Sequence, residues 1–152
     1  MEAASRVATE VGVGAAGPVL LATLGVPFDP DASAFAVDSA VEAGQALIVA
    51  NVVQLPPLSM SVQLGYDQLP DTPEDEAAFR APAALAHSLG VEVERLRVRS
   101  LRPIEAVLEL AAERGPGVLV FGPDRARLKG RLYRKAAKAI RERAACLVWV
   151  AD

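Results

Sequence analysis

Five short apolar segments that alternate with helix-like segments are the feature of this chain that most restricts its fold. The apolar segments are PVLLATL at 18–24, QALIVANVVQ at 45–54, VEVERLRVR at 91–99, GVLVF at 117–121 and LVWVA at 147–151. Four of them are apolar almost throughout, as strands buried on both faces of a parallel sheet must be. The segments between them are long enough for helical crossovers. The alternation predicts a doubly wound α/β domain on a five-stranded parallel sheet in the order 3-2-1-4-5.

Capping signals predict where the helices begin and end. Asp29-Pro30 is typical of an N-cap followed by proline in the first turn, and Gly44 ends that helix. Thr72 caps a second helix, with Pro73 at its first position, that runs to Gly90. Helical spacing indicates two more helices, one on Ile104, Val107, Leu108 and Ala111, the other on Leu132, Ala136 and Ile140.

The chain of 152 residues suits a single domain. We expect residues 17–152 to form it and residues 1–16 to be an N-terminal extension that is poorly ordered or peripheral. Residues 55–71 contain three prolines and no hydrophobic period, which predicts a loop. Residues 91–99 alternate apolar and charged side chains, which is typical of an edge strand with one solvated face.

A cytoplasmic location is expected from the cysteine content. Cys146 is the single cysteine, so no intramolecular disulfide requires an oxidising compartment. Residues 11–28 are apolar enough to raise the question of a signal peptide, but glycines and prolines interrupt them and acidic residues outnumber basic ones in front of them. No membrane association is expected.

Charge is distributed unevenly along the chain. Residues 1–90 carry two basic and eleven acidic side chains, a net charge of −9, whereas residues 91–152 carry fourteen basic and eight acidic ones, a net charge of +6. Residues 122–145 alone hold nine Arg and Lys residues. An anionic ligand or partner would meet the protein there, unless the charges only solvate a helix face. No specific nucleic acid is expected as a partner.

Catalytic and metal-binding motifs are weak or missing. Gly12 to Gly17 matches G-x-G-x-x-G, but a strand follows the motif and no strand precedes it, opposite to a dinucleotide site. The P-loop spacing is absent around Lys129. His87 lies within a predicted helix with only Ser88 as a neighbouring nucleophile, and no metal-ligand cluster occurs. We therefore predict no catalytic residues, no metal and no enzyme activity.

Three segments in the last third of the chain are IEAVLELA at 104–111, GVLVFG at 117–122 and RAACLVWV at 143–150. They resemble the third helix, fourth strand and closing strand of the universal stress protein family. The resemblance extends from about Pro18 to Asp152. It implies a three-layer sandwich of the adenine nucleotide alpha hydrolase-like or flavodoxin-like kind.

The resemblance also implies where a nucleotide site would lie. Nucleotide-binding members of the family carry an Asp at the end of the first strand and a loop G-x2-G-x9-G-[ST] after the fourth. Here Leu24 replaces the Asp and Val26 replaces a nearby Ser. Gly122 matches the first loop glycine, whereas Arg125 stands at the second.

Allowing one deleted residue, Arg134 and Lys135 occupy the last Gly-[ST] pair. Side chains at these positions fill space that a phosphate needs, so we expect ATP binding in the family's pose to be lost. Their guanidinium groups can still attract an anion in another pose. The candidate nucleotide or anion site consists of Gly25, Val52, Gly122, Arg125, Gly130, Arg134 and Lys135.

The closing strand suggests how copies of the chain associate. It carries Val148, Trp149 and Val150 without proline or charge, and an apolar sheet edge of this kind invites pairing with another strand. The resemblance implies a homodimer through this strand. The alternative is that Trp149 packs under a helix.

Two functions remain open at this point. The first is a non-enzymatic stress-response domain that acts as a homodimer and through possible protein partners, with no cofactor. The second is a small-ligand sensor that binds AMP, ATP or another anion in the cleft at the ends of strands one and four.

Overall fold

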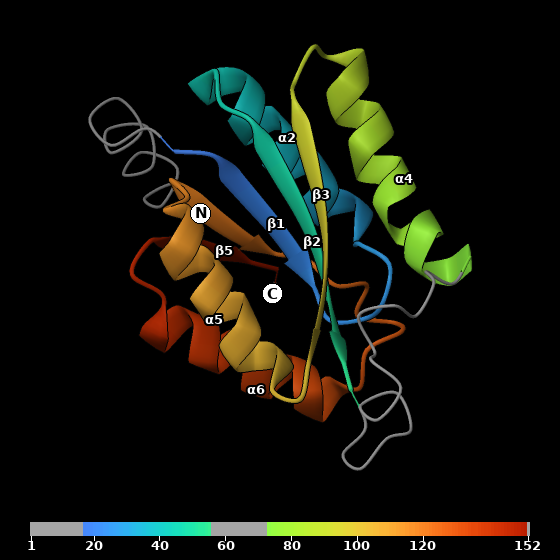
Figure 1. The fold of residues 1–152 in the computed structure, drawn as a ribbon, viewed down its shortest axis with the longest axis vertical. Coiled ribbons are helices and arrows are strands. Elements are labelled where there is room, and N and C mark those ends of the chain that lie inside the picture. The colour runs from blue at the N-terminus through green and yellow to red at the C-terminus, as the bar shows by residue number, and fades with distance from the viewer. Residues whose placement is uncertain (1–16, 56–72, 152) are drawn as a thin grey trace.

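The computed structural model describes residues 17–55 and 73–151, which form one five-stranded parallel sheet flanked by helices (Figure 1). The strand order is β3-β2-β1-β4-β5, as predicted. Along the chain the elements are β1 (Val19–Thr23), α2 (Pro30–Ala43), β2 (Leu47–Gln54), α4 (Pro73–Ser88), β3 (Val93–Ser100), α5 (Pro103–Arg114), β4 (Val118–Phe121), α6 (Gly130–Arg143) and β5 (Leu147–Val150). The predicted N-terminal extension, the Thr72 cap and nearly all of the loop at 55–71 lie outside the described residues.

The core consists of two apolar clusters, one on each face of the sheet. α2 and α4 cover one face, and α5 and α6 cover the other (Figure 1). Successive strand residues alternate between the clusters, so Val19 and Leu21 meet α2 whereas Leu20 and Ala22 meet the α5 and α6 side. Both faces of the central strands are therefore dry, which is why their sequences are continuously apolar.

Three helix ends follow from local capping. The Asp29 carboxylate accepts the Ala32 amide over 3.0 Å at the start of α2, next to Pro30, as the sequence predicts. Gly44 and Gly115 end α2 and α5 in the left-handed conformation, with φ of 65° and 57°. The α6 helix, in contrast, has no side-chain cap at its N-terminus.

The predicted starts of β2 and β3 were wrong by two residues, for one physical reason. Gln45 and Val91 each follow a helix-ending glycine, and their amides donate back to the carbonyl oxygens of Ala40 and Ala86, over 3.0 and 2.9 Å. These bonds complete the helix C-termini and keep both residues out of the sheet. α4 ends at Ser88 rather than Gly90 and continues through Pro82.

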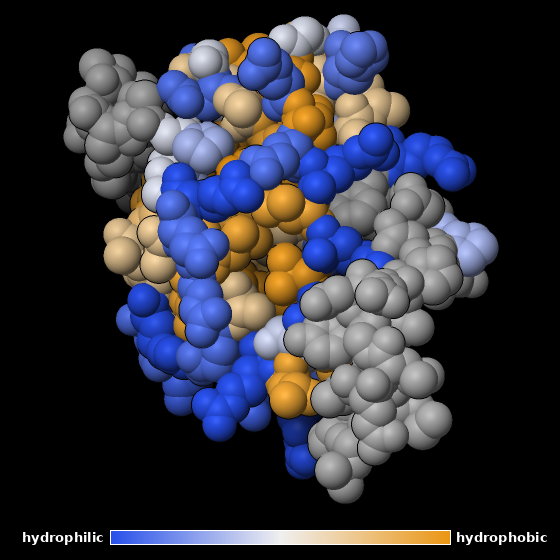
Figure 2. All heavy atoms as spheres, viewed as in Figure 1, coloured by the Kyte–Doolittle hydropathy of each residue, from blue (hydrophilic) through white to orange (hydrophobic). Residues whose placement is uncertain are grey.

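The two edges of the sheet differ in chemistry. β3 is an edge strand, as predicted, and Glu94, Arg95, Arg97 and Arg99 give it a charged, partly exposed surface. Hydrophilic residues surround a small apolar area on this side of the molecule (Figure 2). β5 forms the other edge and carries no charge.

Trp149 on β5 packs against a helix of its own chain. Its indole stacks on the Phe35 ring of α2, with centroids 4.9 Å apart and planes 16° from parallel. The indole Nε1 atom is buried and has no hydrogen-bond partner among the described residues. Stacking and apolar burial, without a polar contact, therefore hold this side chain.

Two substitutions at Trp149 separate packing from hydrogen bonding. We expect Trp149→Ala to lower the free energy of unfolding by about 2–4 kcal/mol because it opens a cavity beside Phe35. Trp149→Phe should lower the free energy of unfolding by less than about 1.5 kcal/mol, because it keeps an aromatic ring and loses no hydrogen bond. Urea unfolding at one fixed protein concentration measures both, and an equal loss for the two variants would contradict this account.

Candidate functional site

The candidate site lies at the carboxyl ends of β1 and β4, where the strand order reverses. β1 is followed by a loop that leads to α2 on one face, and β4 by a loop that leads to α6 on the other. Two neighbouring loops that depart to opposite faces leave a crevice at such a point, and doubly wound folds bind ligands there. Gly25 and Gly122 lie in these two loops.

Two buried polar side chains shape the loop after β1. The Thr23 hydroxyl donates to the Val26 carbonyl oxygen, and the Asn51 side-chain oxygen accepts the Gly25 amide, both over 2.9 Å. Gly25 has a φ of 75°, which favours glycine. Neither Thr23 nor Asn51 was among the predicted site residues, although a polar residue within an apolar strand was the available signal.

Backbone hydrogen bonds tie the two loops to each other. The Asp29 amide donates to the Gly122 carbonyl oxygen, and the Asp124 amide donates to the Pro27 carbonyl oxygen, both over 2.9 Å. The Gly122 amide donates to the Ala22 carbonyl oxygen of β1. Donors that a phosphate-binding loop would turn toward a ligand are thus used within the protein.

Asp124 organises the remainder of the loop after β4. Its side-chain oxygen Oδ1 accepts the Ala126 amide over 3.0 Å. Its backbone carbonyl oxygen accepts the amides of Arg127 and Leu128, over 3.0 and 3.2 Å. Leu128 is buried in the α5 and α6 cluster, so an apolar side chain also anchors this loop.

Gly122 allows the close approach of the loop to α2. A Cβ atom at this position would lie 2.5 Å from the Ala32 Cβ atom in the first turn of α2 and 3.2 Å from the Leu21 side chain. No larger residue fits without a backbone shift. Packing within the protein therefore accounts for this glycine without any ligand.

Arg125 lies over an aromatic ring. Its guanidinium carbon is 4.2 Å from the centroid of the Tyr133 ring, a cation–π distance. Tyr133 is buried, stacks near Phe121 at 5.8 Å, and donates its hydroxyl hydrogen to the Ala151 carbonyl oxygen over 2.6 Å. The ring thus joins α6 to β4 and to the end of β5, and Arg125 covers its outer side.

The remaining predicted site residues separate into three places. A Cβ atom on Gly130 would lie 3.1 Å from Nη1 of Arg134, so the Arg134 guanidinium lies over the start of α6. Lys135 lines a hollow between α5 and α6. Val52 is fully buried in the cluster beneath α5. The structure therefore brings Gly130 and Arg134 together and places Lys135 and Val52 elsewhere.

Leu24 and Val26, which the resemblance aligns with polar residues of the family, are apolar. Leu24 at the end of β1 is buried in the α5 and α6 cluster, and Val26 packs against the same cluster. Neither side chain offers an acceptor to a ribose or a base. Thr23 and Asn51, the buried polar residues nearby, are already engaged with the loop backbone.

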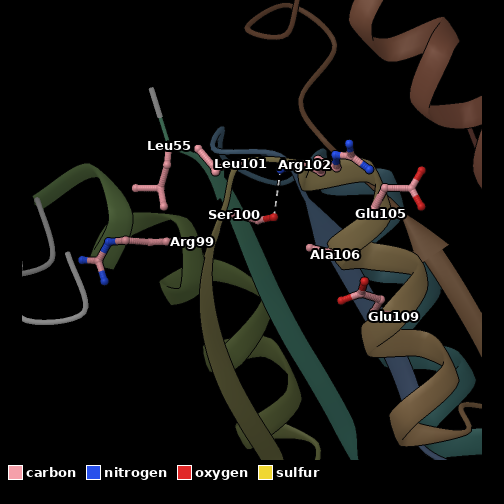
Figure 3. A pocket seen from close by; sticks show the side chains of 8 residues that line it. All are labelled: Leu55, Arg99, Ser100, Leu101, Arg102, Glu105, Ala106 and Glu109. Carbon is pink, nitrogen blue, oxygen red and sulfur yellow. Dashed lines mark hydrogen bonds between the residues drawn. The ribbon is translucent and has the colours of Figure 1, made fainter. Parts of the chain in front are cut away.

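Two shallow hollows lie beside this crevice, at the start of α5. The first has a volume of about 540 Å³ and lies beyond the ends of β2 and β3 (Figure 3). The second has a volume of about 430 Å³ and lies between α5 and α6. The first is lined by Leu55, Arg99, Ser100, Leu101, Arg102, Glu105, Ala106 and Glu109.

An ion pair lines part of the second hollow. The Arg143 guanidinium donates to both carboxylate oxygens of Glu105, over 2.6 and 2.7 Å. These hydrogen bonds lower the pKa of Glu105 below its usual value and raise the pKa of Arg143. Both groups are therefore charged at neutral pH, and the pair leaves little net charge on this part of the hollow.

Two reactive side chains, Cys146 and Ser88, lie outside the crevice. Burial raises the pKa of the Cys146 thiol, which lowers its thiolate content at neutral pH. The Ser88 hydroxyl donates to the Leu85 carbonyl oxygen rather than to His87.

In residues 17–55 and 73–151 no group of three His, Cys, Asp or Glu side chains could hold a metal ion. No helix in the same ranges is both long and apolar enough to cross a membrane.

The crevice, the sheet order and the loop positions define a class of α/β nucleotide-binding-like domains. The model of the Universal stress protein family matches residues 16–152. The chain belongs to the universal stress protein family. A search of curated proteins found no match.

Solved structures of the family share the fold at low sequence identity. One is a universal stress protein in complex with cAMP, with 21% identity, a TM-score of 0.61, and coverage of 89% of this chain and 95% of that one. A family member from Burkholderia pseudomallei has 19% identity, a TM-score of 0.63, and coverage of 89% and 95%. The Archaeoglobus fulgidus protein in complex with dAMP has 20% identity, a TM-score of 0.60, and coverage of 90% and 98%.

Two glycines, one in the loop after β4 and one in the first turn of α6, provide a matched test of the close approach at the crevice. We expect Gly122→Ala to lower the free energy of unfolding by about 1–3 kcal/mol, because its Cβ atom would overlap Ala32. Gly130→Ala meets only the movable end of Arg134 and should be neutral or stabilising by up to about 1 kcal/mol in the first turn of α6. Urea unfolding compares the two, and equal stabilities would disprove the close packing.

Proposed function

We propose that this chain is a non-catalytic stress-response domain that acts as a homodimer and does not bind ATP in the pose of its nucleotide-binding relatives. The observation that carries the proposal is the use of loop donors within the protein. The amides of Gly122 and Asp124 donate to the β1 side, and those of Arg127 and Leu128 donate to Asp124. A triphosphate would have to displace these bonds before it could be held.

Side-chain identity supports the same proposal. Leu24 and Val26 offer an apolar surface where the family's nucleotide-binding members have polar groups. Arg125 covers Tyr133, and Arg134 covers the start of α6, so both occupy space near the loop. Both the missing hydrogen-bond acceptors and the added side-chain bulk disfavour ATP binding.

ATP binding tests this part of the proposal directly. Isothermal titration calorimetry should detect no ATP binding with a Kd of about 1 µM or tighter, because two arginine side chains occupy space near the loop and several loop amides are already bonded within the protein. The triple variant Leu24→Asp, Arg125→Gly, Arg134→Gly restores the family's acceptor and removes both guanidinium groups. It should bind ATP more tightly than the unmodified chain. Submicromolar binding by the unmodified chain would refute the proposal.

A second candidate function is a small-anion or AMP sensor. The α6 N-terminus has no side-chain cap and no acidic residue in its first turn, so its first amides can face an anion. Arg134 and Lys129 add positive charge there. Solved relatives hold cAMP and dAMP, which have one phosphate group each. The same titration with AMP and with sulfate tests this candidate, and anion binding that weakens steeply with salt would favour it.

The difference between the sheet edges supports the homodimer. β5 exposes an edge of four apolar residues, whereas β3 protects its edge with charged side chains. We place the dimer contact on Val148, Trp149 and Val150. Trp149 contributes through its backbone, because its ring already packs on Phe35.

Matched substitutions on the two edges test the dimer. Val148 and Val98 are both half-buried against the α5 and α6 cluster, one on each edge strand. Sedimentation velocity at micromolar concentration should show a dimer for the unmodified chain and a monomer for Val148→Asp, while Val98→Asp remains a dimer. Circular dichroism verifies that each variant is folded. A monomeric unmodified chain would contradict the homodimer.

The proposal includes a cytoplasmic location and an N-terminal extension at residues 1–16 that is separate from the domain. The thiol of Cys146 is free and partly buried, and no disulfide is needed for the fold. Stress-response activity then arises from contacts with other proteins rather than from turnover of a substrate.

A further inference from the structure

The loop after β4 and helix α6 present a row of cations, most of which have no role in the fold or in the proposed function. We define the basic face as Arg127, Lys129, Arg131, Arg134, Lys135 and Lys138, all of which are exposed. None of the six forms an ion pair with another described residue. Only Asp124 and Glu142 are acidic between residues 122 and 145, and Asp124 already accepts the Ala126 amide.

Helical spacing aligns these charges. Arg131, Arg134, Lys135 and Lys138 recur at three- and four-residue intervals, so they lie along one side of α6 about one turn, or ~5.4 Å, apart. The opposite side of α6 is buried through Tyr133, Ala136, Ala137 and Ile140. Because the core holds that side, the cations stand on a rigid support. In Figure 2 hydrophilic residues gather over α5 and α6.

The acidic residues of α2 and Glu105 of α5 do not cancel this face. Asp31, Asp38 and Glu42 are exposed on α2, which covers the other face of the sheet. Two layer spacings of ~10 Å separate that surface from α6, whereas the Debye length at physiological salt is ~8 Å. On α5, Glu105 is neutralised by Arg143. A net charge of −3 therefore does not prevent an anion from binding to α6.

We propose that the basic face binds the phosphodiester backbone of nucleic acid without reading its sequence. Half of the six cations are arginines, whose planar guanidinium groups suit phosphate oxygens. Regular cations along a helix match a partner with regular anions. The basic face has no exposed aromatic ring for base stacking, since Tyr133 is buried. Its contacts are therefore limited to the phosphodiester backbone of the nucleic acid.

Two other anionic partners fit the structure less well. A membrane-surface helix needs an apolar side to insert, and here that side of α6 is in the core. An acidic protein partner needs an apolar centre in the interface. The exposed large hydrophobic residues of the described chain are Val41, Leu85, Leu89 and Leu101, and none of them belongs to α6 or to the loop before it.

Salt dependence gives the proposal a quantitative form. Six phosphate contacts predict that log K falls with log salt concentration at a slope of about −5 for duplex DNA. Non-specific binding of this type has a Kd of about 10⁻⁴ to 10⁻⁶ M at physiological salt. Affinity should not depend on base sequence, because no base edge is contacted.

Fluorescence anisotropy with labelled 20-nucleotide duplexes of two unrelated sequences tests the proposal. The unmodified chain should bind both equally, with the slope given above. Lys129→Gln with Lys138→Gln should reduce the slope by about two and weaken binding about tenfold or more at low salt. Neither lysine side chain contacts the core, so both variants should fold.

The matched control is Arg80→Gln with Arg95→Gln, which removes the same charge from α4 and β3. It should leave the slope and the affinity unchanged. Equal weakening in the control would overturn the proposal, because the effect would then follow net charge alone. The absence of salt-dependent binding would overturn it as well. Tighter binding to polyaspartate or to anionic vesicles than to DNA would assign the face to an acidic protein or to a membrane instead.

Discussion

The approach of Gly122 to the first turn of α2 is the contact on which the arrangement of the crevice depends. With no Cβ atom at Gly122, the loop after β4 lies against Ala32, and the amide and carbonyl groups of Gly122 bond to Ala22 and Asp29. Asp29 in turn caps α2 through Ala32. One small residue thus links the central strand, the cap of α2 and the loop that leads to α6. A change there affects every element that borders the crevice.

This linkage makes the fold independent of a bound ligand. The backbone of the crevice is held by bonds within the protein, so the fold does not require a nucleotide for its stability. Apolar Leu24 and Val26 pack into the core instead of facing a ligand. The proposed loss of the ATP site is therefore compatible with an intact sheet and intact loops.

The sheet also separates an acidic surface from a basic surface. Acidic residues of α2 lie on one face and the basic residues of α6 on the other, with an apolar core between them. The two edges differ as well, since β3 is charged and β5 is apolar. Each of the four sides of the domain thus offers a different chemistry to a partner. The net charge of −3 does not reflect this separation of acidic and basic surfaces.

The sequence by itself determined the strand order, the parallel sheet, the cap at Asp29, the stop at Gly44 and the edge positions of β3 and β5, because apolar periodicity and capping are local signals. Tertiary structure alone decided that Asn51 reaches Gly25, that Arg125 covers Tyr133 and that Trp149 stacks on Phe35. The Asn51 and Trp149 contacts join residues far apart in the chain, and the Arg125 contact depends on the conformation of the loop before α6, so no local pattern encodes them. The starts of β2 and β3 depended on hydrogen bonds back to a finished helix, which form only when the glycine after that helix adopts its left-handed conformation.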